Sequence, residues 1–366
     1  KLSGVRIMAY TTIDDPSAHF HIRLYTGNSN TGQTITNNAN AGDFQADWLW
    51  IKNRDDVEQH HLMDSNRGAN KFLHSNASDD EREGSYNGGH NDINAFGSNG
   101  FTITSSGSGD ELNFGSRLYV AWQWKCNGGT TTSQTGADIN SVTQTNTTAG
   151  FSIVTYTGDG NTSQTVKHGL GAVPEAIIMK NRDRSSQWES YFEPIGNSHI
   201  IELSTSTIKQ DTDNFGNTDP TSTVFTVDSG ANNANASGED IVAYCFRSIQ
   251  GYSKIGSYKG NGNADGTFVY LGFKPAWVII KGITVGHAWL MYDNIRDSDG
   301  NPNDTVILGS DTTAEFTSSN KMDFLSNGFK LVSNSTQTND SGEEFLYMAF
   351  AEHPFVSSKG IPVTAK

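Results

Sequence analysis

Histidine and carboxylate side chains gather in one stretch of the chain, where they could bind a metal ion or exchange protons. The stretch contains His60, His61, His74 and His90, with Asp79, Asp80, Glu81 and Glu83 close by. A zinc site or an acid–base pair needs such side chains to converge, but their spacing follows no His-Glu-x-x-His pattern and no nucleophile motif accompanies them. The sequence therefore favours a protein that is not an enzyme.

A second polar cluster, near the C-terminus, is dense in the oxygen ligands that calcium prefers. The candidate ligands are Asp297, Asp299, Asn301 and Asp304. The run lacks the glycine at the sixth position of an EF-hand loop, and Leu308 stands where the bidentate glutamate would be. Calcium binding is one hypothesis for this loop and solvated turn residues are the other. No further cofactor is expected.

An acid–base pair with three-residue spacing occurs twice in the chain. The two pairs are Asp64 with Arg67, and Asp293 with Arg296. Such a pair could bind a polar ligand, but a charge-assisted clamp that holds a loop to the fold is the simpler interpretation. The corresponding stretch between the two pairs carries Glu193 and Gly196, which cannot form the same pair. We therefore expect two structural clamps.

These pairs belong to a threefold internal repeat. Its opening phrase occurs as Tyr25-Thr26-Gly27-Asn28, Tyr156-Thr157-Gly158-Asp159 and Tyr258-Lys259-Gly260-Asn261. An apolar run that ends in a lysine follows each phrase, and an apolar strand centred on an alanine closes each copy. The lysines are Lys52, Lys180 and Lys281, and the alanines are Ala121, Ala243 and Ala349. The lysine and the alanine stand 69, 63 and 68 residues apart, a near-constant spacing that indicates triplication.

The repeat predicts how the chain is divided. The expected parts are an N-terminal arm or strand at residues 1–24, a first module at 25–127, a linker at 128–150, a second module at 151–248, a third module at 252–355 and a tail at 356–366. The linker is assigned from its composition, because threonine, serine, asparagine and glycine dominate it.

The closing strands predict the fold class because both of their faces are apolar. In the first copy Val120, Trp122 and Trp124 lie on one face, and Tyr119 and Ala121 lie on the other. A strand of this kind is covered on both sides. The sequence shows roughly eight short strands per module, separated by turn signals, and it lacks helical periodicity. These features predict an all-β chain of three tandem β-sandwich, jelly-roll-like modules.

Composition and charge exclude several classes of partner. The formal net charge is −15, which disfavours contact with nucleic acid or with acidic lipid. The only two cysteines, Cys126 and Cys245, are too few for a disulfide framework, so we expect two free thiols. No apolar run reaches the length of a membrane span. We therefore expect neither nucleic acid nor a membrane as a partner.

Several of these motifs resemble repeats of known virion proteins. The resemblance rests on Tyr156-Thr157-Gly158-Asp159-Gly160, His168-Gly169-Leu170-Gly171, Leu62-Met63-Asp64-Ser65-Asn66-Arg67-Gly68, Ser98-Asn99-Gly100-Phe101 and the ending Met348-Ala349-Phe350-Ala351-Glu352-His353-Pro354. These stretches are similar to tail-fibre-like and other structural proteins of marine bacteriophages. The resemblance implies a location at the virion surface, outside the cell, and it implies no catalytic residues. Other virion proteins and further copies of the chain are the partners it implies.

Three classes of function remain open at this point. The first is a non-enzymatic structural protein of the virion surface (tail fibre, other tail part or head decoration) that acts through multivalent contacts. The second is a carbohydrate-binding adhesin in which Trp188, Trp289 or Tyr191 stacks on a host glycan. The third is a glycan-degrading spike, which needs two carboxylates across a groove. The repeats favour the first, with the polar loops at residues 76–94 and 297–304 as contact points.

Overall fold

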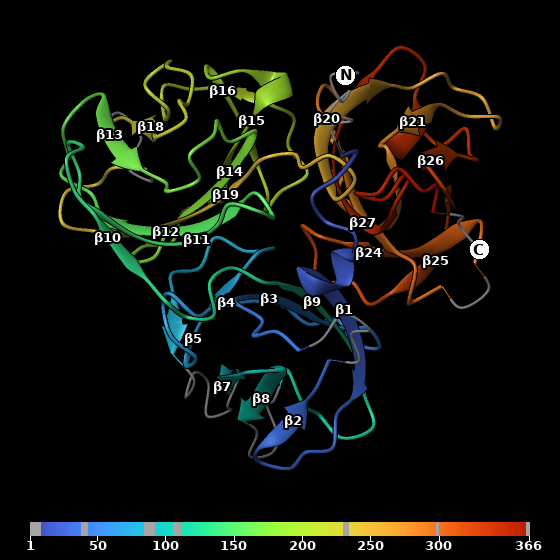
Figure 1. Ribbon diagram of the computed structural model, residues 1–366, viewed down its shortest axis with the longest axis horizontal. Coiled ribbons are helices and arrows are strands. Elements are labelled where there is room, and N and C mark those ends of the chain that lie inside the picture. The colour runs from blue at the N-terminus through green and yellow to red at the C-terminus, as the bar shows by residue number, and fades with distance from the viewer. Residues whose placement is uncertain are drawn as a thin grey trace, which may run out of the picture.

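Three β-sheet modules follow one another along the chain and meet at a common centre. The computed structural model describes residues 9–37, 43–83, 92–104, 111–229, 234–297 and 300–363. Figure 1 shows the three modules as separate lobes, the first coloured blue to teal, the second green to yellow and the third orange to red. Their strands pair antiparallel throughout, so the predicted all-β sandwich fold is confirmed. No helix within the described ranges is both long and apolar enough to span a membrane.

Module 1 contains one short 3₁₀ helix and nine strands in the described residues. They are η1 (Pro16–Ala18), β1 (Phe20–Thr26), β2 (Gln33–Ile35), β3 (Trp48–Asn53), β4 (His60–Asp64), β5 (Lys71–His74), β6 (Arg82–Glu83), β7 (Asp92–Gly97), β8 (Gly100–Thr104) and β9 (Leu118–Trp124). The main sheet has the order β1-β9-β3-β4-β5-β6, and β2-β8-β7 forms the second layer.

Module 2 has a longer main sheet. Its elements are β10 (Thr132–Gln134), β11 (Ser141–Asn146), β12 (Phe151–Thr157), β13 (Gln164–Lys167), β14 (Ala176–Asn181), β15 (Glu189–Phe192), η3 (Glu193–Ile195), β16 (His199–Glu202), β17 (Gln210–Asp211), β18 (Val224–Val227) and β19 (Asp240–Phe246). The main sheet has the order β10-β11-β12-β19-β14-β15-β16-β17, and β13 pairs with β18 in the second layer.

Module 3 forms one continuous sheet that bends round to make both layers. Its elements are β20 (Ser253–Lys259), β21 (Phe268–Tyr270), β22 (Phe273–Gly282), β23 (Leu290–Asp293), β24 (Asn303–Leu308), β25 (Phe316–Leu325), β26 (Gly328–Leu331), α1 (Thr336–Asn339) and β27 (Glu344–Pro354). The strand order is β20-β27-β22-β23-β24-β25-β26-β21.

The same four-strand core recurs in all three modules. Its order is β1-β9-β3-β4 in module 1, β12-β19-β14-β15 in module 2 and β20-β27-β22-β23 in module 3. In each core the closing strand of the repeat pairs with both the opening strand and the strand that ends in the recurring lysine. The predicted triplication is therefore present in the topology as well as in the sequence.

Two boundaries predicted from the sequence were wrong. The stretch at residues 128–150 is not a linker, because it contains β10 and β11, which extend the main sheet of module 2. Threonine fits a pleated strand, and Ser141 and Thr143 on β11 are buried while Val142 between them is exposed. The first module also begins before residue 25, since β1 starts at Phe20.

Each sandwich encloses its own apolar core. Ala121, Ala243 and Ala349 are fully buried, and each lies in the core of its own module. The strand registers align Ala121 with Ala243 but place Tyr347 at this position of module 3, so the repeat alignment predicted from the sequence was wrong by two residues at Ala349. In modules 1 and 2 the aromatic Tyr119 and the aliphatic Ile241 share that face of the closing strand. The small alanines let the second layer approach the main sheet closely.

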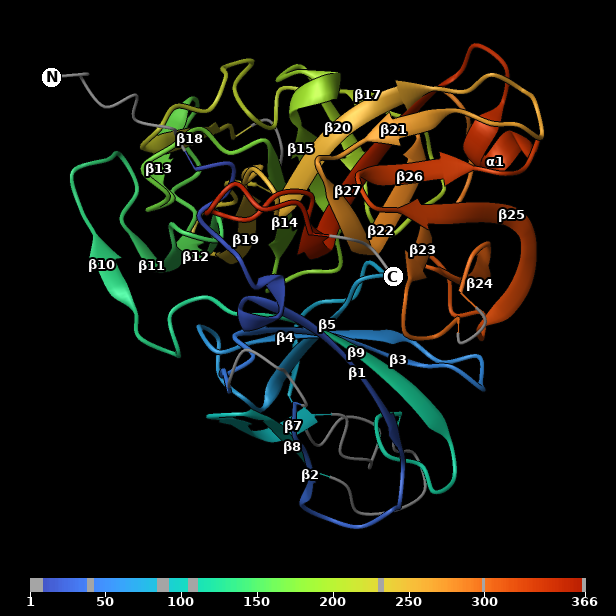
Figure 2. The same cartoon turned by 45° about the vertical axis from the view of Figure 1, so that its right-hand side comes forward.

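The opposite face of each main sheet packs into a fourth core, shared by the three modules. All seven tryptophans of the chain are buried in this central cluster. Trp48 and Trp124 of module 1 lie against Phe246 of module 2 and Trp277 of module 3, with ring centroids 5.6 and 5.7 Å apart respectively. Figures 1 and 2 both show the main sheets converging on the middle of the molecule. The apolar second face that the sequence assigned to the closing strands therefore joins the modules.

The recurring Tyr-x-Gly phrase anchors the loop that precedes each closing strand. The Tyr25, Tyr156 and Tyr258 hydroxyls donate to backbone carbonyls of the segment before the closing strand at 2.9, 2.6 and 2.6 Å, and in module 3 this carbonyl belongs to Thr338 of α1. A Cβ on the glycine of the phrase would lie only 2.1–2.3 Å from a loop carbonyl oxygen in every copy. The phrase is thus a structural requirement of each module.

Candidate functional site

Strands β4 and β5 of module 1 bring two of the histidines together. His61 on β4 lies directly opposite His74 on β5, and both side chains are buried. His60 points to the other face of the sheet, since successive strand residues alternate. Its Nε2 lies 3.0 Å from the carbonyl oxygen of Leu308 in module 3, so His60 serves a module junction. His90 lies outside the described residues.

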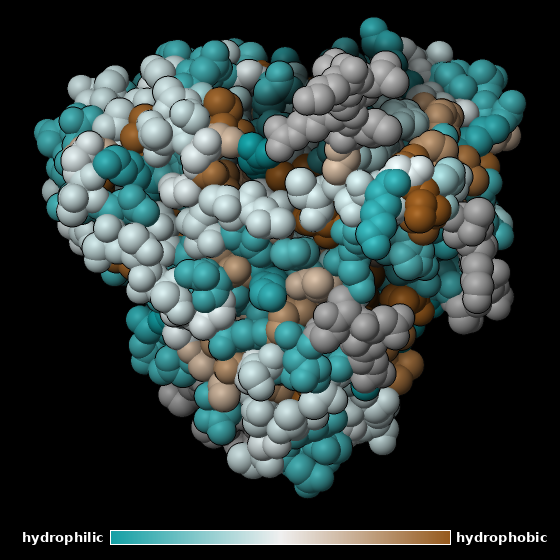
Figure 3. All heavy atoms as spheres, viewed as in Figure 1, coloured by the Kyte–Doolittle hydropathy of each residue, from teal (hydrophilic) through white to brown (hydrophobic). Residues whose placement is uncertain are grey.

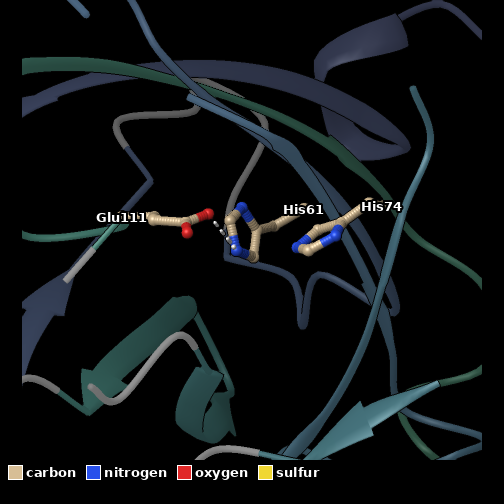
Figure 4. Close-up of side chains that lie close together, drawn as sticks. All are labelled: His61, His74 and Glu111. Atoms are coloured by element: carbon tan, nitrogen blue, oxygen red, sulfur yellow. Dashed lines mark ion pairs between the residues drawn. The ribbon is translucent and has the colours of Figure 1, made fainter. Parts of the chain in front are cut away.

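Glu111, in the loop before β9, completes a cluster with the two histidines. Its Oε2 lies 3.3 Å from Nε2 of His61. Figure 4 shows His61 between Glu111 and His74, with the three side chains turned toward one another. One donor atom from each of the three lies within 4.8 Å of the other two, and no other group of this kind occurs in the described parts of the chain.

The histidine rings carry free nitrogen lone pairs in this setting. Burial lowers the pKa of His61 and of His74, so both imidazoles are neutral near pH 7. Asp79 Oδ2 lies 3.1 Å from Nδ1 of His74, which orients that ring. Nε2 of His61 and Nε2 of His74 have no hydrogen-bond partner among the described residues. Burial first, and then the charge of Glu58, raises the pKa of Glu111 to about 7.

A surface pocket of about 600 Å³ opens beside Glu111. Its lining residues are Asn53, Asp56, Val57, Glu58, Glu111, Phe114 and Arg117. The buried ammonium group of Lys52 lies beneath it and donates to the carbonyl oxygens of Asn53 and Asp56 at 2.6 and 3.1 Å. Burial lowers the pKa of Lys52 to about 8. Glu111 therefore belongs to both features: it lines the pocket, and its buried Oε2 atom faces His61.

The two acid–base pairs singled out in the sequence are formed. Arg67 donates through Nε to Asp64, and Arg296 Nε donates to Asp293 Oδ2 at 2.6 Å. The backbone N–H groups of Arg67 and Arg296 also donate to the Oδ1 atoms, both at 2.9 Å. All four side chains are buried, as a structural clamp requires.

Each clamp also receives a donor from a neighbouring module, which sequence reasoning missed. The hydroxyl of Tyr244 in module 2 donates to Asp64 Oδ2 at 2.7 Å. The indole Nε1 of Trp122 in module 1 donates to Asp293 Oδ2 at 3.0 Å. Tyr244 and Trp122 each follow the recurring alanine of their closing strand directly. The clamps therefore fix one module to the next.

A bridging glutamate extends each clamp into a network across the junction. Glu81 of module 1 accepts two hydrogen bonds from Arg182 of module 2, at 2.9 and 2.8 Å, and one from its own Arg67 at 2.8 Å. Glu315 of module 3 binds Arg54 of module 1 and its own Arg296 in the same way. The backbone carbonyl of Ser78 also accepts a hydrogen bond from the backbone N–H of Ser186 in module 2, so two residues of a predicted contact loop, Ser78 and Glu81, lie at this junction.

The remaining junction, between modules 2 and 3, replaces this network with apolar contacts. The strand register aligns Phe192 with Asp64 and Asp293, so the predicted equivalents Glu193 and Gly196 were displaced by one residue. The positions equivalent to the aspartate, the two arginines and the donor are apolar and lie in the central cluster: Phe192 and Ile195 of module 2, and Ile283 and Met348 of module 3. Lys209 stands where the other two junctions have the bridging glutamate, because its backbone N–H donates to the carbonyl of Ile283 as those of Glu81 and Glu315 donate to the carbonyls of Arg182 and Arg54. The aspartate, the arginines and the donor have therefore all become apolar in this junction, and the glutamate has become a lysine.

The proposed calcium ligands are held by partners within the protein. Asp297 Oδ2 accepts from the backbone N–H of Asp304 at 2.7 Å, and the carboxylate of Asp304 pairs with Lys321 at 3.1 Å. The side chain of Asn301 accepts from and donates to the backbone of Phe324, at 2.7 and 2.9 Å. Asp299 lies outside the described residues. These contacts explain the polar residues of the loop, and calcium binding stays a hypothesis.

Three acidic residues of these sites escaped sequence reasoning. Glu111 is more than thirty residues from either histidine and belongs to no motif. In the sequence Glu81 stands out only as a neighbour of the histidines, and Glu315 belongs to no motif. A signal for Glu81 and Glu315 existed in the sequence, because each is an acidic residue that follows a clamp arginine. Glu81 lies 14 residues after Arg67, and Glu315 lies 19 residues after Arg296. No comparable signal marks Glu111.

The fold and the junctions define an all-β protein in which three β-sandwich modules share one core. Comparison with known families matches residues 15–354 to a domain of unknown function (DUF7483), and the chain belongs to this family. No curated protein and no solved structure gives a significant match.

Proposed function

We propose that this protein is a non-enzymatic structural protein of a bacteriophage virion surface, which acts through multivalent contacts. The observation that carries the proposal is that the repeated residues have structural roles. The clamp pairs, the recurring lysines and the Tyr-x-Gly phrases are buried and hold modules or loops in place. A catalytic protein would instead be expected to converge its recurring polar residues on an open site.

The arrangement of the modules supports action by contact. Three linked modules give the chain several surfaces in fixed relative positions, so that weak contacts can add. Figure 3 shows hydrophilic residues over most of one face of all three modules, with hydrophobic residues scattered among them. The repeats that resemble virion proteins supply the location, and neighbouring virion proteins or further copies of the chain are the proposed partners.

The adhesin alternative loses the residues on which it was based. Trp188, Trp289 and Tyr191 are 0, 1 and 3% exposed, so none of them can stack on a glycan. Large exposed aromatic side chains in the described ranges are Phe114, Phe268 and Tyr270. Phe268 and Tyr270 lie two residues apart on β21, and therefore on one face of that strand. A glycan-binding function would have to use this pair.

The glycan-degrading alternative retains one supporting feature, the pocket that Glu58 and Glu111 line. A carboxyl group with a pKa near 7 is suited to general-acid catalysis, and Glu111 has this property. The alternative is tested by incubating the purified chain with host surface polysaccharide and measuring new reducing ends. We expect none, and cleavage that Glu111→Gln abolishes would replace the proposed function.

The virion location is tested on particles of a phage whose genome encodes this chain. Density-purified particles are digested and their proteins quantified by mass spectrometry, with the unassembled fraction of the same lysate as the control. We expect the chain in purified particles at a fixed ratio to the major capsid protein. Recovery only in the unassembled fraction would overturn the proposal.

A further inference from the structure

We infer that His61, His74 and Glu111 of module 1 bind one divalent transition-metal ion, with zinc as the ion that suits them best. Two neutral imidazoles and a carboxylate are a donor set that zinc takes in proteins. Calcium and magnesium favour oxygen ligands alone and do not match this set. The inference is independent of the virion proposal, because it concerns residues outside the repeated motifs.

The geometry is close to that of a tetrahedral site. With zinc–ligand bonds of about 2 Å, neighbouring donors of a tetrahedron lie about 3.3 Å apart. Nε2 of His61 and Oε2 of Glu111 are already separated by 3.3 Å. The donor atom of His74 lies within 4.8 Å of both. The pairing of His61 with His74 across β4 and β5 holds the two imidazoles in place, so only small side-chain shifts separate this arrangement from coordination.

The burial of the histidines supplies the second argument. Nε2 of His61 and Nε2 of His74 are inaccessible to solvent and form no hydrogen bond with a described residue. Nε2 of His61 lies 3.3 Å from Oε2 of Glu111, but without hydrogen-bond geometry. A buried polar atom that forms no hydrogen bond costs free energy, and an ion bound by both rings would satisfy both nitrogens. Asp79 binds the other nitrogen of His74, which is the carboxylate–histidine arrangement that orients metal ligands.

The site belongs to module 1 alone. The register places Glu189 and Glu202 of module 2, and Leu290 and Leu308 of module 3, at the positions of His61 and His74. Three protein ligands leave one position of a tetrahedral ion for water. A bound ion would tie the loop that carries Glu111 to the main sheet.

The test is a calorimetric titration of zinc chloride into the full chain after treatment with EDTA. We expect one zinc ion per chain, and an affinity at least about tenfold lower in His74→Gln and Glu111→Gln. Asp79→Asn should weaken binding by about 10- to 100-fold, because it releases the ring that Asp79 orients. His353→Gln is the matched control: His353 is exposed in module 3, and its loss should leave the affinity unchanged.

Two outcomes would overturn the inference: no stoichiometric binding by the wild-type chain, or equal affinity in wild type, His74→Gln and Glu111→Gln. Circular dichroism of each variant shows whether it has folded. A readout that needs no variant is cobalt substitution. Cobalt(II) bound at this site should give the intense visible absorption of a tetrahedral complex and lose it on addition of zinc, whereas a spectrum of hydrated cobalt would contradict the site.

Discussion

At the scale of single residues, the charged side chains of this protein are buried where they connect modules. Removal of one partner of a buried ion pair leaves the other charge without compensation, which costs far more than breaking a pair at the surface. Glu81 joins two arginines from two modules, and both lie in largely buried positions. The stability of the molecule should therefore depend strongly on a few such residues.

Glu81→Gln should reduce the free energy of unfolding by roughly 3 kcal/mol at pH 7. Burial alone would raise the pKa of Glu81, but Arg182 and Arg67 outweigh it and lower the pKa to about 2. Because the folded pKa lies below the ordinary value of 4.5, this contribution is present above about pH 4.5 and is lost as the pH falls through 2. Urea denaturation at several pH values measures it.

The difference between wild type and Glu81→Gln should accordingly shrink between pH 5 and pH 2. Glu83→Gln is the control, since the Glu83 side chain is 67% exposed, and it should change stability by less than about 0.5 kcal/mol. A Glu81→Gln variant as stable as wild type at pH 7 would show that the junction network does not hold the modules.

The three recurring lysines predict a second pH effect, for which Lys281 is the simplest case. Burial lowers the pKa of Lys281 to about 8, from 10.5. Between these values the unfolded chain holds a proton that the folded chain has released, so the free energy of unfolding rises with pH. The slope should reach at most about 1.4 kcal/mol per pH unit from this group.

Urea denaturation between pH 8 and pH 10 should show a smaller slope for Lys281→Met than for wild type. Lys259→Met removes an exposed lysine of the same module and should keep the wild-type slope. Identical slopes for wild type and Lys281→Met would mean that Lys281 stays protonated in the folded protein over this range.

At the scale of the secondary-structure elements, the closing strand of each module separates two cores. One face fills the sandwich of its own module and the other enters the central cluster, as β19 shows with Ala243 and Tyr244. The sequence predicted both apolar faces, because alternation along a strand is a local property. It could not say that the second face meets other modules, because that depends on how three sheets pack.

Ala243→Leu should destabilise the protein by about 1–3 kcal/mol through over-packing of the module 2 sandwich. Ala243 is fully buried, so the added atoms displace neighbouring side chains. Thermal unfolding measures the change. Val142→Leu, at a 37% exposed position on β11 of the same sheet, is the control and should leave the midpoint nearly unchanged. Equal midpoints for Ala243→Leu and wild type would contradict the close packing beside β19.

Prediction from the sequence failed where composition or long-range contact decides the structure. Residues 128–150 read as a linker because polar residues dominate them, yet the alternating burial at Ser141 and Thr143 belongs to a strand. Glu111 could not be paired with His61, because only the folded sheet and the loop before β9 bring them together. The clamps were predictable since Asp64 and Arg67 lie one turn apart, and their contacts with the next module were not.

At the scale of the whole molecule, one rule relates the three modules in cyclic order. The indole of Trp188 in module 2 donates to the carbonyl oxygen of His74 in module 1, and the indole of Trp289 in module 3 donates to the carbonyl oxygen of Glu202 in module 2. The ring of His60 in module 1 makes the corresponding contact with the carbonyl oxygen of Leu308 in module 3. These three contacts occupy equivalent strand positions, so each module meets the next in the same way. Two junctions are ionic and one is apolar, but all three lie against the same tryptophan-rich core.

The central claim is that the three modules form one body, whose surfaces keep fixed positions and so support multivalent contact. Differential scanning calorimetry of the full chain tests it most directly. We expect a single unfolding transition whose calorimetric and van't Hoff enthalpies agree, because loss of any module exposes the shared core. Two or three resolved transitions, with modules that unfold independently, would contradict the claim.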